Sequence, residues 1–139
     1  MMKKIFCIFI LFISSGNLFA KTEYIKEGID LYNKKKFEDA KFKFEQEIEF
    51  NPKSEISHLY LCKIFNKQDK KDLEEKNLNT VVLLNPKNEE AIYNLVRLKL
   101  KSSDYQKSKE LNKKLKSICS KLCNKSDRLK IEIDNLSKK

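Results

Sequence analysis

The string Asn-Pro-Lys-Ser-Glu at residues 51–55 returns as Asn-Pro-Lys-Asn-Glu at residues 85–89, an interval of 34 residues. That interval accommodates two antiparallel helices and two short turns. Chains that repeat such a unit stack their helix pairs into a solenoid, because one pair cannot bury its own apolar face. The interval therefore predicts an all-α helical repeat protein, which offers an open surface to another polypeptide and no enclosed pocket.

Apolar residues follow the same 34-residue register along the chain. Phe37, Ala40, Phe44 and Ile48 have helical spacing, and Asn51-Pro52 ends the pattern. The second and third units repeat this plan. We expect repeats at about 21–54, 55–88 and 89–122, followed by a capping helix at about 126–137, for which residues 124–127 supply the helix-starting polar residues.

The composition agrees with one helical domain. With only 2 Gly and 2 Pro among 139 residues, a turn-rich β fold is disfavoured, because tight turns depend on those residues. A hydrophobic content of 40% is enough for a core. Residues 21–139 are therefore expected to form a single repeat domain.

The first twenty residues have the layout of a secretory signal peptide. Lys3 and Lys4 precede an apolar run over residues 5–13, and Ala20 is a small residue at the expected cleavage site. The run is well short of the ~20 residues that span a bilayer, although a retained membrane anchor is the alternative. We expect an exported protein that is periplasmic or associated with the cell envelope.

The positive charge is concentrated in the C-terminal third. The whole chain carries a formal charge of +10, whereas residues 21–90 carry −1 and residues 91–139 carry +9. Such a region could bind an anionic surface or nucleic acid. Export argues against a nucleic-acid partner, so an anionic headgroup or polymer is the alternative to a protein partner.

The chain resembles the tetratricopeptide repeat (TPR) family. The resemblance rests on Gly-Ile-Asp-Leu-Tyr at 28–32, Phe-Glu-Asp-Ala at 37–40, Phe44 and Asn51-Pro52. A small residue such as Gly28, or Cys62 one period later, lets the second helix of its own unit approach closely. Six residues depart from the family pattern of small, large and proline positions: Glu27, Glu47, Glu74, Lys99, Asn112 and Ser120.

The resemblance implies that the first helix of each unit lines a groove that binds the partner. The matching positions are Ile25, Ile29, Tyr32, Asn33, Leu59, Lys63, Asn66, Lys67, Tyr93, Arg97, Leu100 and Lys101. Lys63 and Arg97 lie one period apart, as do Lys67 and Lys101, so we expect a positive ladder that favours an acidic segment. A solvated lysine-rich face is the alternative. The clamp that some relatives use for a terminal carboxylate is missing, because Ile25, Ile29, Tyr60 and Glu90 replace its residues.

Cys119 and Cys123 are candidates for a disulfide. In a continuous helix their Cβ atoms would be about 6 Å apart, beyond the ~3.5–4.5 Å that a disulfide requires, so the helix would have to end near Cys119. Cys62 is expected to be a small buried residue. His58 has no further ligands near it in the sequence, and we expect no metal site and no cofactor.

No catalytic motif is evident. The chain has no glycine-rich phosphate loop, and its carboxylates fit solvated helix faces. The sequence therefore predicts a non-enzymatic interaction module, an exported scaffold or assembly factor without a small-molecule substrate. Its partner is expected to be another protein or a peptide.

Overall fold

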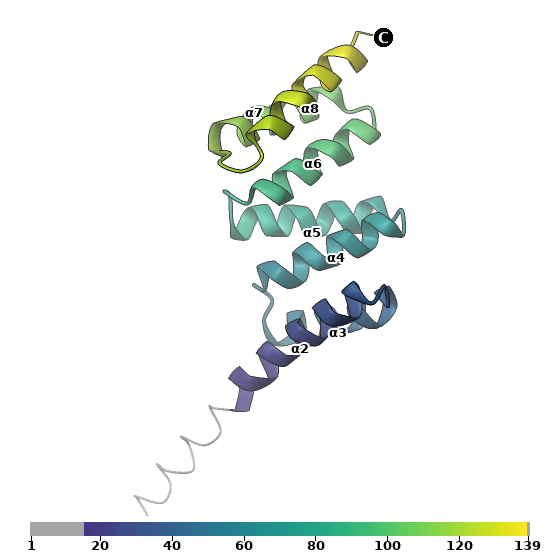
Figure 1. The fold of residues 1–139 in the computed structure, drawn as a ribbon, viewed down its shortest axis with the longest axis vertical. Coiled ribbons are helices and arrows are strands. Elements are labelled where there is room, and N and C mark those ends of the chain that lie inside the picture. The colour runs from purple at the N-terminus through teal and green to yellow at the C-terminus, as the bar shows by residue number, and fades with distance from the viewer. Residues whose placement is uncertain (1–15, 139) are drawn as a thin grey trace, which may run out of the picture. The chain divides into compact units, whose positions relative to one another are not determined.

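The structure, a computed structural model, describes residues 16–138, with side chains described from Glu23 onwards. Residues 1–15 of the expected signal peptide lie outside this range. The described chain is all-α, as predicted, and no helix in it is long and apolar enough to span a bilayer (Figure 1). Its seven helices are α2 (Gly16–Asn33), α3 (Phe37–Phe50), α4 (Glu55–Lys67), α5 (Lys71–Leu84), α6 (Glu89–Lys101), α7 (Tyr105–Ile118) and α8 (Cys123–Leu136).

Helix boundaries repeat with the interval read from the sequence. Helices α3, α5 and α7 begin at residues 37, 71 and 105, and α4 and α6 begin at residues 55 and 89. Each turn inside a helix pair contains one residue in the left-handed conformation, namely Lys35 (φ 60°), Asp69 (φ 53°) and Ser103 (φ 59°). These residues are also 34 positions apart. The same backbone turn therefore recurs although none of the three residues is glycine.

The capping helix differs from its expected position. Helix α8 begins at Cys123, three residues before the expected start, and so keeps the register of α4 and α6. Its N-cap, Leu122, makes no side-chain cap hydrogen bond. The polar residues that suggested a later start are not the cap, because contacts of the preceding loop position the N-terminus of α8, as described below.

Residue contacts divide the chain into two compact units, residues 1–60 and 61–139, with the boundary inside α4. In the first unit, α2 packs against α3. Phe44 of α3 is fully buried and stacks on Tyr60, with ring centroids 4.9 Å apart. A Cβ atom added to Gly28 would lie 2.8 Å from Cε1 of Phe44, so the close approach requires glycine.

The second unit has a core formed by its last three helices. Helix α6 packs against α5 and α7, and α8 packs against α7 and α6 (Figure 1). Leu129 and Ile133 of α8 are buried in this core. The remaining buried members of the cluster are Ile92, Val96, Leu100 and Leu115. Helix α8 therefore covers apolar surface that α6 and α7 would otherwise expose.

Candidate functional site

The groove positions predicted in the first unit are mostly packing residues. The Tyr32 ring meets Phe37 and Tyr60 edge to face, with centroid separations of 5.4 and 5.2 Å. Ile25 and Ile29 are half-buried, as is Leu59 at the start of α4. Asn33 is exposed at the end of α2. This part of the predicted face is apolar and partly covered.

Cationic groups dominate the predicted face in the second unit. Lys67, Arg97 and Lys101 are exposed on α4 and α6. Lys63 is half-buried and forms an ion pair with Glu90 across α4 and α6, with Nζ 2.9 Å from Oε1. Because Glu90 compensates the charge of Lys63, the predicted Lys63–Arg97 ladder has one neutralised member.

Leu100 is a correction to the predicted groove. Its side chain lies in the core cluster of the second unit and is only 8% exposed. Helix α6 has apolar residues on more than one side, because it packs against α5, α7 and α8. The position equivalent to a groove residue in the repeat therefore faces a neighbouring helix here and cannot contact a partner.

A buried carboxylate lies beside the cationic residues. Glu74 of α5 is buried and accepts hydrogen bonds from Nδ2 of Asn66 at 2.9 and 3.1 Å. Burial raises the pKa of the Glu74 carboxyl, while the Asn66 hydrogen bonds and the charge of Lys101 oppose the rise. Asn66 and Lys101 therefore have interactions inside the protein and are not simply open contact groups.

Tyr93 opens onto a pocket of about 580 Å³ at the N-terminal end of α6. The Lys125 ammonium lies over the Tyr93 ring, 5.2 Å from its centroid, in a cation–π arrangement. Lys87, Lys121 and Lys125 line the pocket together with Glu89 and Glu90. The pocket is thus polar and aromatic, with more cationic than anionic side chains.

The loop between α7 and α8 holds the Glu89 carboxylate. The backbone N–H groups of Ser120, Lys121 and Leu122 donate to it at 2.7, 3.0 and 2.8 Å, and Oγ of Ser120 donates at 2.7 Å. These donors, above all the Ser120 hydroxyl, lower the pKa of Glu89 to about 2. The contact ties the loop to the start of α6.

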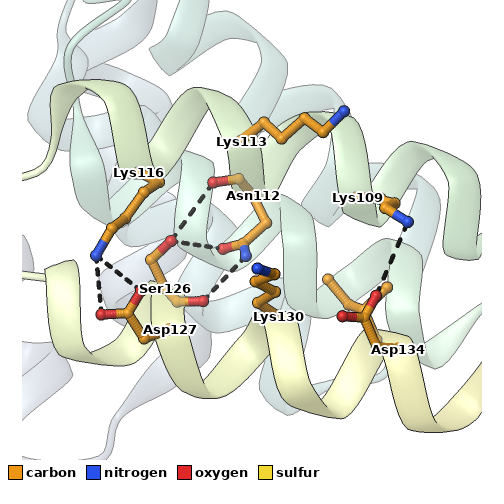
Figure 2. A pocket seen from close by; sticks show the side chains of 9 residues that line it. Lys109, Asn112, Lys113, Lys116, Ser126, Asp127, Lys130 and Asp134 are labelled. Atoms are coloured by element: carbon orange, nitrogen blue, oxygen red, sulfur yellow. Dashed lines mark hydrogen bonds and ion pairs between the residues drawn. The ribbon is translucent and has the colours of Figure 1, made fainter.

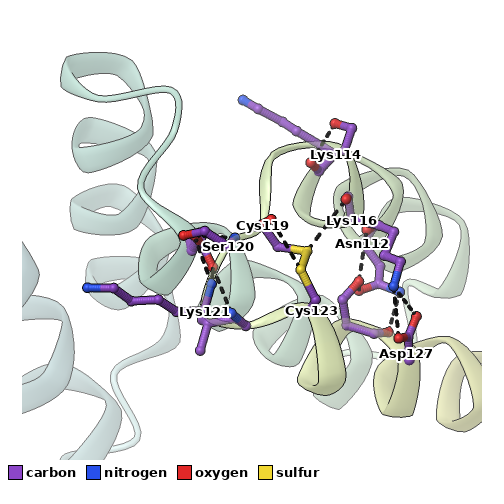
Figure 3. The surroundings of a disulfide bond; sticks show 12 residues. Asn112, Lys114, Lys116, Cys119, Ser120, Lys121, Cys123 and Asp127 are labelled. Atoms are coloured by element: carbon purple, nitrogen blue, oxygen red, sulfur yellow. Dashed lines mark hydrogen bonds and ion pairs between the residues drawn. A yellow bond between two sulfur atoms is a disulfide. The ribbon is translucent and has the colours of Figure 1, made fainter.

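The same loop contains the Cys119–Cys123 disulfide (Figure 3). Helix α7 ends at Ile118 and α8 begins at Cys123, which is the interruption that the sequence required for this bond. The two Cα atoms are 5.3 Å apart, within the usual range for a disulfide. The disulfide and the Glu89 contact together define the conformation of residues 119–123.

Cys62 and the carboxylates do not form a metal centre. Cys62 is buried and reduced, and burial raises the pKa of its thiol to about 12. Across residues 16–138, no group of three or more His, Cys, Asp or Glu side chains could hold a metal ion. Cys62 therefore fills a packing position, one period after Gly28.

Three site residues were missed in the sequence. Glu90 was considered only as a missing clamp residue, although it pairs with Lys63. Glu89 is not among the predicted groove residues, and its contact is with a loop 31–33 residues away. Lys125 was part of the supposed cap. None of these contacts joins positions that are equivalent in the repeat, so the 34-residue interval gives no signal for them.

Solved structures share this fold, whereas no family model and no curated protein matches the sequence. One is the Yersinia enterocolitica type III secretion chaperone SycD in complex with a peptide of the translocator YopD. It has a TM-score of 0.75 and 14% identity, and the match covers 90% of this chain and 95% of that chain. Another is the TPR2B-domain complex of yeast Sti1 with pHsp70, with a TM-score of 0.76, 12% identity, and coverage of 84% and 98%. A third is the Sgt2 TPR domain of Aspergillus fumigatus, with a TM-score of 0.72, 15% identity, and coverage of 86% and 82%.

This chain has the tetratricopeptide-repeat fold. Its six departures from the TPR pattern share one property, which is that each forms a polar contact with another side chain or with the backbone. The pairs are Glu27–Lys43, Glu47–Asn51, Glu74–Asn66, Lys99–Glu75, Asn112–Ser126 and Ser120–Glu89. The TPR packing therefore tolerates these residues because most of their polar atoms have partners.

Proposed function

We propose that this chain is an exported, non-catalytic scaffold or assembly factor that binds a protein or peptide segment through the first helices of its repeats. The observation that supports this proposal is the TPR fold, which it shares over most of its length with the peptide-bound SycD structure. The exposed cations on α4 and α6 favour a segment with acidic residues.

The face that carries the proposal in the second unit is defined by Lys67, Tyr93, Arg97 and Lys101, which we call the α4–α6 face. Arg97 is exposed, and no ion pair of its guanidinium occurs within the described residues. A guanidinium binds a carboxylate through two parallel hydrogen bonds, so Arg97 is the residue best suited to an acidic partner. Lys63 is a weaker choice because it already pairs with Glu90.

The proposal is tested by capturing partners from the envelope fraction of the source cell. The mature chain, beginning at Lys21, is crosslinked and purified as wild type and as Arg97→Glu. We expect Arg97→Glu to reduce recovery of the specific partner at least tenfold, because charge reversal replaces attraction with repulsion. The matched control is Lys76→Glu, which changes the same charge at an exposed position on α5. Equal recovery by both variants would contradict a role for the α4–α6 face.

The alternative is binding to an anionic surface through the basic region at residues 91–139. The two functions differ in their response to salt. Binding by counterion release weakens steeply as ionic strength rises, whereas a partner held partly by Tyr93 and half-buried apolar residues keeps much of its affinity. A salt series on the captured complex therefore distinguishes them.

A further inference from the structure

The loop that binds Glu89 is the loop that the disulfide closes. The Cys119–Cys123 bond forms a ring around residues 120–122 (Figure 3). Each of these three residues donates its backbone N–H to the Glu89 carboxylate, at 2.7, 3.0 and 2.8 Å. Successive N–H groups bind one anion only when the backbone turns them towards the same point. The conformation that the disulfide restrains is therefore the conformation that the carboxylate requires.

The same ring forms one wall of the pocket at Tyr93. Residues 120–122 and Glu89 line that pocket. Lys125, two residues beyond Cys123 on α8, places its ammonium 5.2 Å from the centroid of the Tyr93 ring. Tyr93 belongs to the α4–α6 face. A change in the disulfide ring can therefore reach this face through the pocket wall and through Lys125.

The charge of the pocket depends on where the Glu89 carboxylate is held. In the loop, its charge is met by the three N–H groups and by the Ser120 hydroxyl, which donates at 2.7 Å. The other carboxylate of the pocket, Glu90, pairs with Lys63. Release of Glu89 from the loop would leave its negative charge without these donors, and that charge would oppose an acidic partner.

Contacts outside the ring also hold α8 on α7 (Figure 2). Nδ2 of Asn112 donates to the Ser126 carbonyl at 2.9 Å, and Oγ of Ser126 donates to Oδ1 of Asn112 at 2.9 Å. Nζ of Lys116 lies 2.7 Å from Oδ1 of Asp127. None of these bonds passes through residues 119–123, so the first effect of breaking the disulfide falls on the loop and on Glu89.

The disulfide is placed for exchange with a dithiol. Cys119 and Cys123 are both half-buried, so a reductant reaches them from solvent. Cys123 is the first residue of α8, where the positive end of the helix dipole stabilises a thiolate, and a stabilised thiolate leaves readily in disulfide exchange. A ring of five residues also adds little loop-closure entropy in favour of the bond.

We propose that Cys119–Cys123 is a reversible redox site whose co-reactant is a dithiol, and that its oxidation state controls the hold of the loop on Glu89. One thiolate of the dithiol attacks Sγ of Cys119, and Cys123 leaves as a thiolate. The second thiol of the co-reactant displaces Cys119 and closes the co-reactant's own disulfide, so two electrons and two protons pass to the protein. The effect on a partner rests on the proposed function, whereas the coupling to Glu89 does not.

The coupling is tested through its reciprocity, because a disulfide that favours the Glu89 contact must be favoured by that contact to the same degree. The purified chain is equilibrated in mixtures of reduced and oxidised dithiothreitol at pH 7, and the reduced fraction is measured by mass after alkylation. We expect Glu89→Gln to raise the equilibrium constant for reduction about tenfold. The matched control is Glu90→Gln, which removes the neighbouring carboxylate of the pocket and should leave the constant unchanged. Equal constants for Glu89→Gln and wild type would overturn the coupling.

A second measurement follows the Glu89 carboxyl carbon by NMR in oxidised and reduced wild type, over the pH range in which circular dichroism shows native helix content. Its pKa of about 2 should rise towards ~4.3 on reduction, because the loop N–H groups no longer converge on the carboxylate. An unchanged titration would also count against the coupling.

The consequence for binding is measured with a synthetic tetraglutamate peptide and fluorescence anisotropy. We expect reduced wild type, and the double variant Cys119→Ser, Cys123→Ser, to bind at least threefold more weakly than oxidised wild type. Equal affinity in both redox states would overturn control of the pocket. Absence of binding in either state would instead contradict the acidic partner of the proposed function, while the exchange constants still decide the coupling.

Discussion

At the scale of single residues, Gly28 sets the distance between α2 and α3. The Phe44 ring lies over it, and an added Cβ atom would be 2.8 Å from Cε1 and 2.9 Å from Cζ of that ring. Phe44 has little freedom to move, because it is fully buried and stacks on Tyr60. The helical glycine is therefore retained despite its cost in helix propensity.

Gly28→Ala should destabilise the protein by about 1–2 kcal/mol, measured by chemical denaturation. Overpacking costs ~1–3 kcal/mol, and the alanine regains at most about 1 kcal/mol of helix propensity. The control is the same change in a Phe44→Leu background, where the smaller side chain relieves the clash. If Gly28→Ala stabilises the protein equally in both backgrounds, the close approach is not what requires glycine.

Glu89 makes stability depend on pH in the acid range. Its folded pKa of about 2 is below the ~4.3 of a free glutamate, so the folded state favours the ionised carboxylate. This contribution is fully present above the unfolded pKa and is lost as the pH falls from about 4.3 towards 2. Protonation removes the charge that the loop N–H groups bind.

Glu89→Gln should therefore lower the unfolding temperature at pH 7, and the difference from wild type should shrink as the pH approaches 2. Thermal unfolding followed by circular dichroism across this range measures the effect. Glu132→Gln, at an exposed carboxylate of α8, serves as the control. A difference between Glu89→Gln and wild type that stays constant from pH 7 to pH 2 would contradict the assigned contact.

At the scale of elements, the loop at residues 119–123 positions α8. The disulfide closes a short loop, three backbone N–H groups bind Glu89, and Asn112 bonds to Ser126 on the first turn of α8. Leu129 and Ile133 then enter the core. The helix thus depends on the loop for its position and on burial for its stability.

The double variant Cys119→Ser, Cys123→Ser lacks the disulfide and should be less stable than wild type by about 2 kcal/mol. The loss is modest because a disulfide that closes a five-residue loop removes little entropy from the unfolded chain. Hydrogen exchange should rise first in α8 amides. Reduction of wild type gives a second measurement, with the buried Cys62 unlabelled by thiol reagents as its internal control. Unchanged exchange in α8 after reduction would show that the remaining contacts suffice.

At the scale of the whole molecule, charge is distributed unevenly. Residues 21–90 are nearly neutral and residues 91–139 carry +9. The structure shows that part of this excess is compensated locally, since Lys99, Lys107, Lys109 and Lys116 each pair with a carboxylate. The net charge of the region therefore overstates the number of cations that a partner can meet.

Export should yield a chain that begins at Lys21. Intact mass measured on protein from the envelope fraction tests this expectation, with Ala20→Arg expected to block cleavage because the site requires a small residue. Lys21→Gln, which keeps Ala20, is the control and should be processed normally. An unprocessed wild-type chain in the membrane fraction would instead support a retained anchor.

The repeat and the helices could be predicted from the sequence because both depend on local spacing. The 34-residue interval, the apolar periodicity and the Asn-Pro stops place α3 to α7, and the need for an interruption near Cys119 follows from helix geometry alone. The resemblance to the TPR pattern identified Gly28 as a close-packing residue. These features involve residues that are near in sequence or repeat at a constant interval.

Contacts between different helices were decided only by the tertiary structure. Lys63 pairs with Glu90, and the loop at 119–123 binds Glu89, although the 34-residue interval relates neither pair of partners. Leu100 is buried by helices that pack on α6. The start of α8 at Cys123, instead of about residue 126, was also decided by the tertiary structure. Residue types and spacing set what each helix can bury, whereas packing in three dimensions determines which polar groups meet and which cations stay exposed.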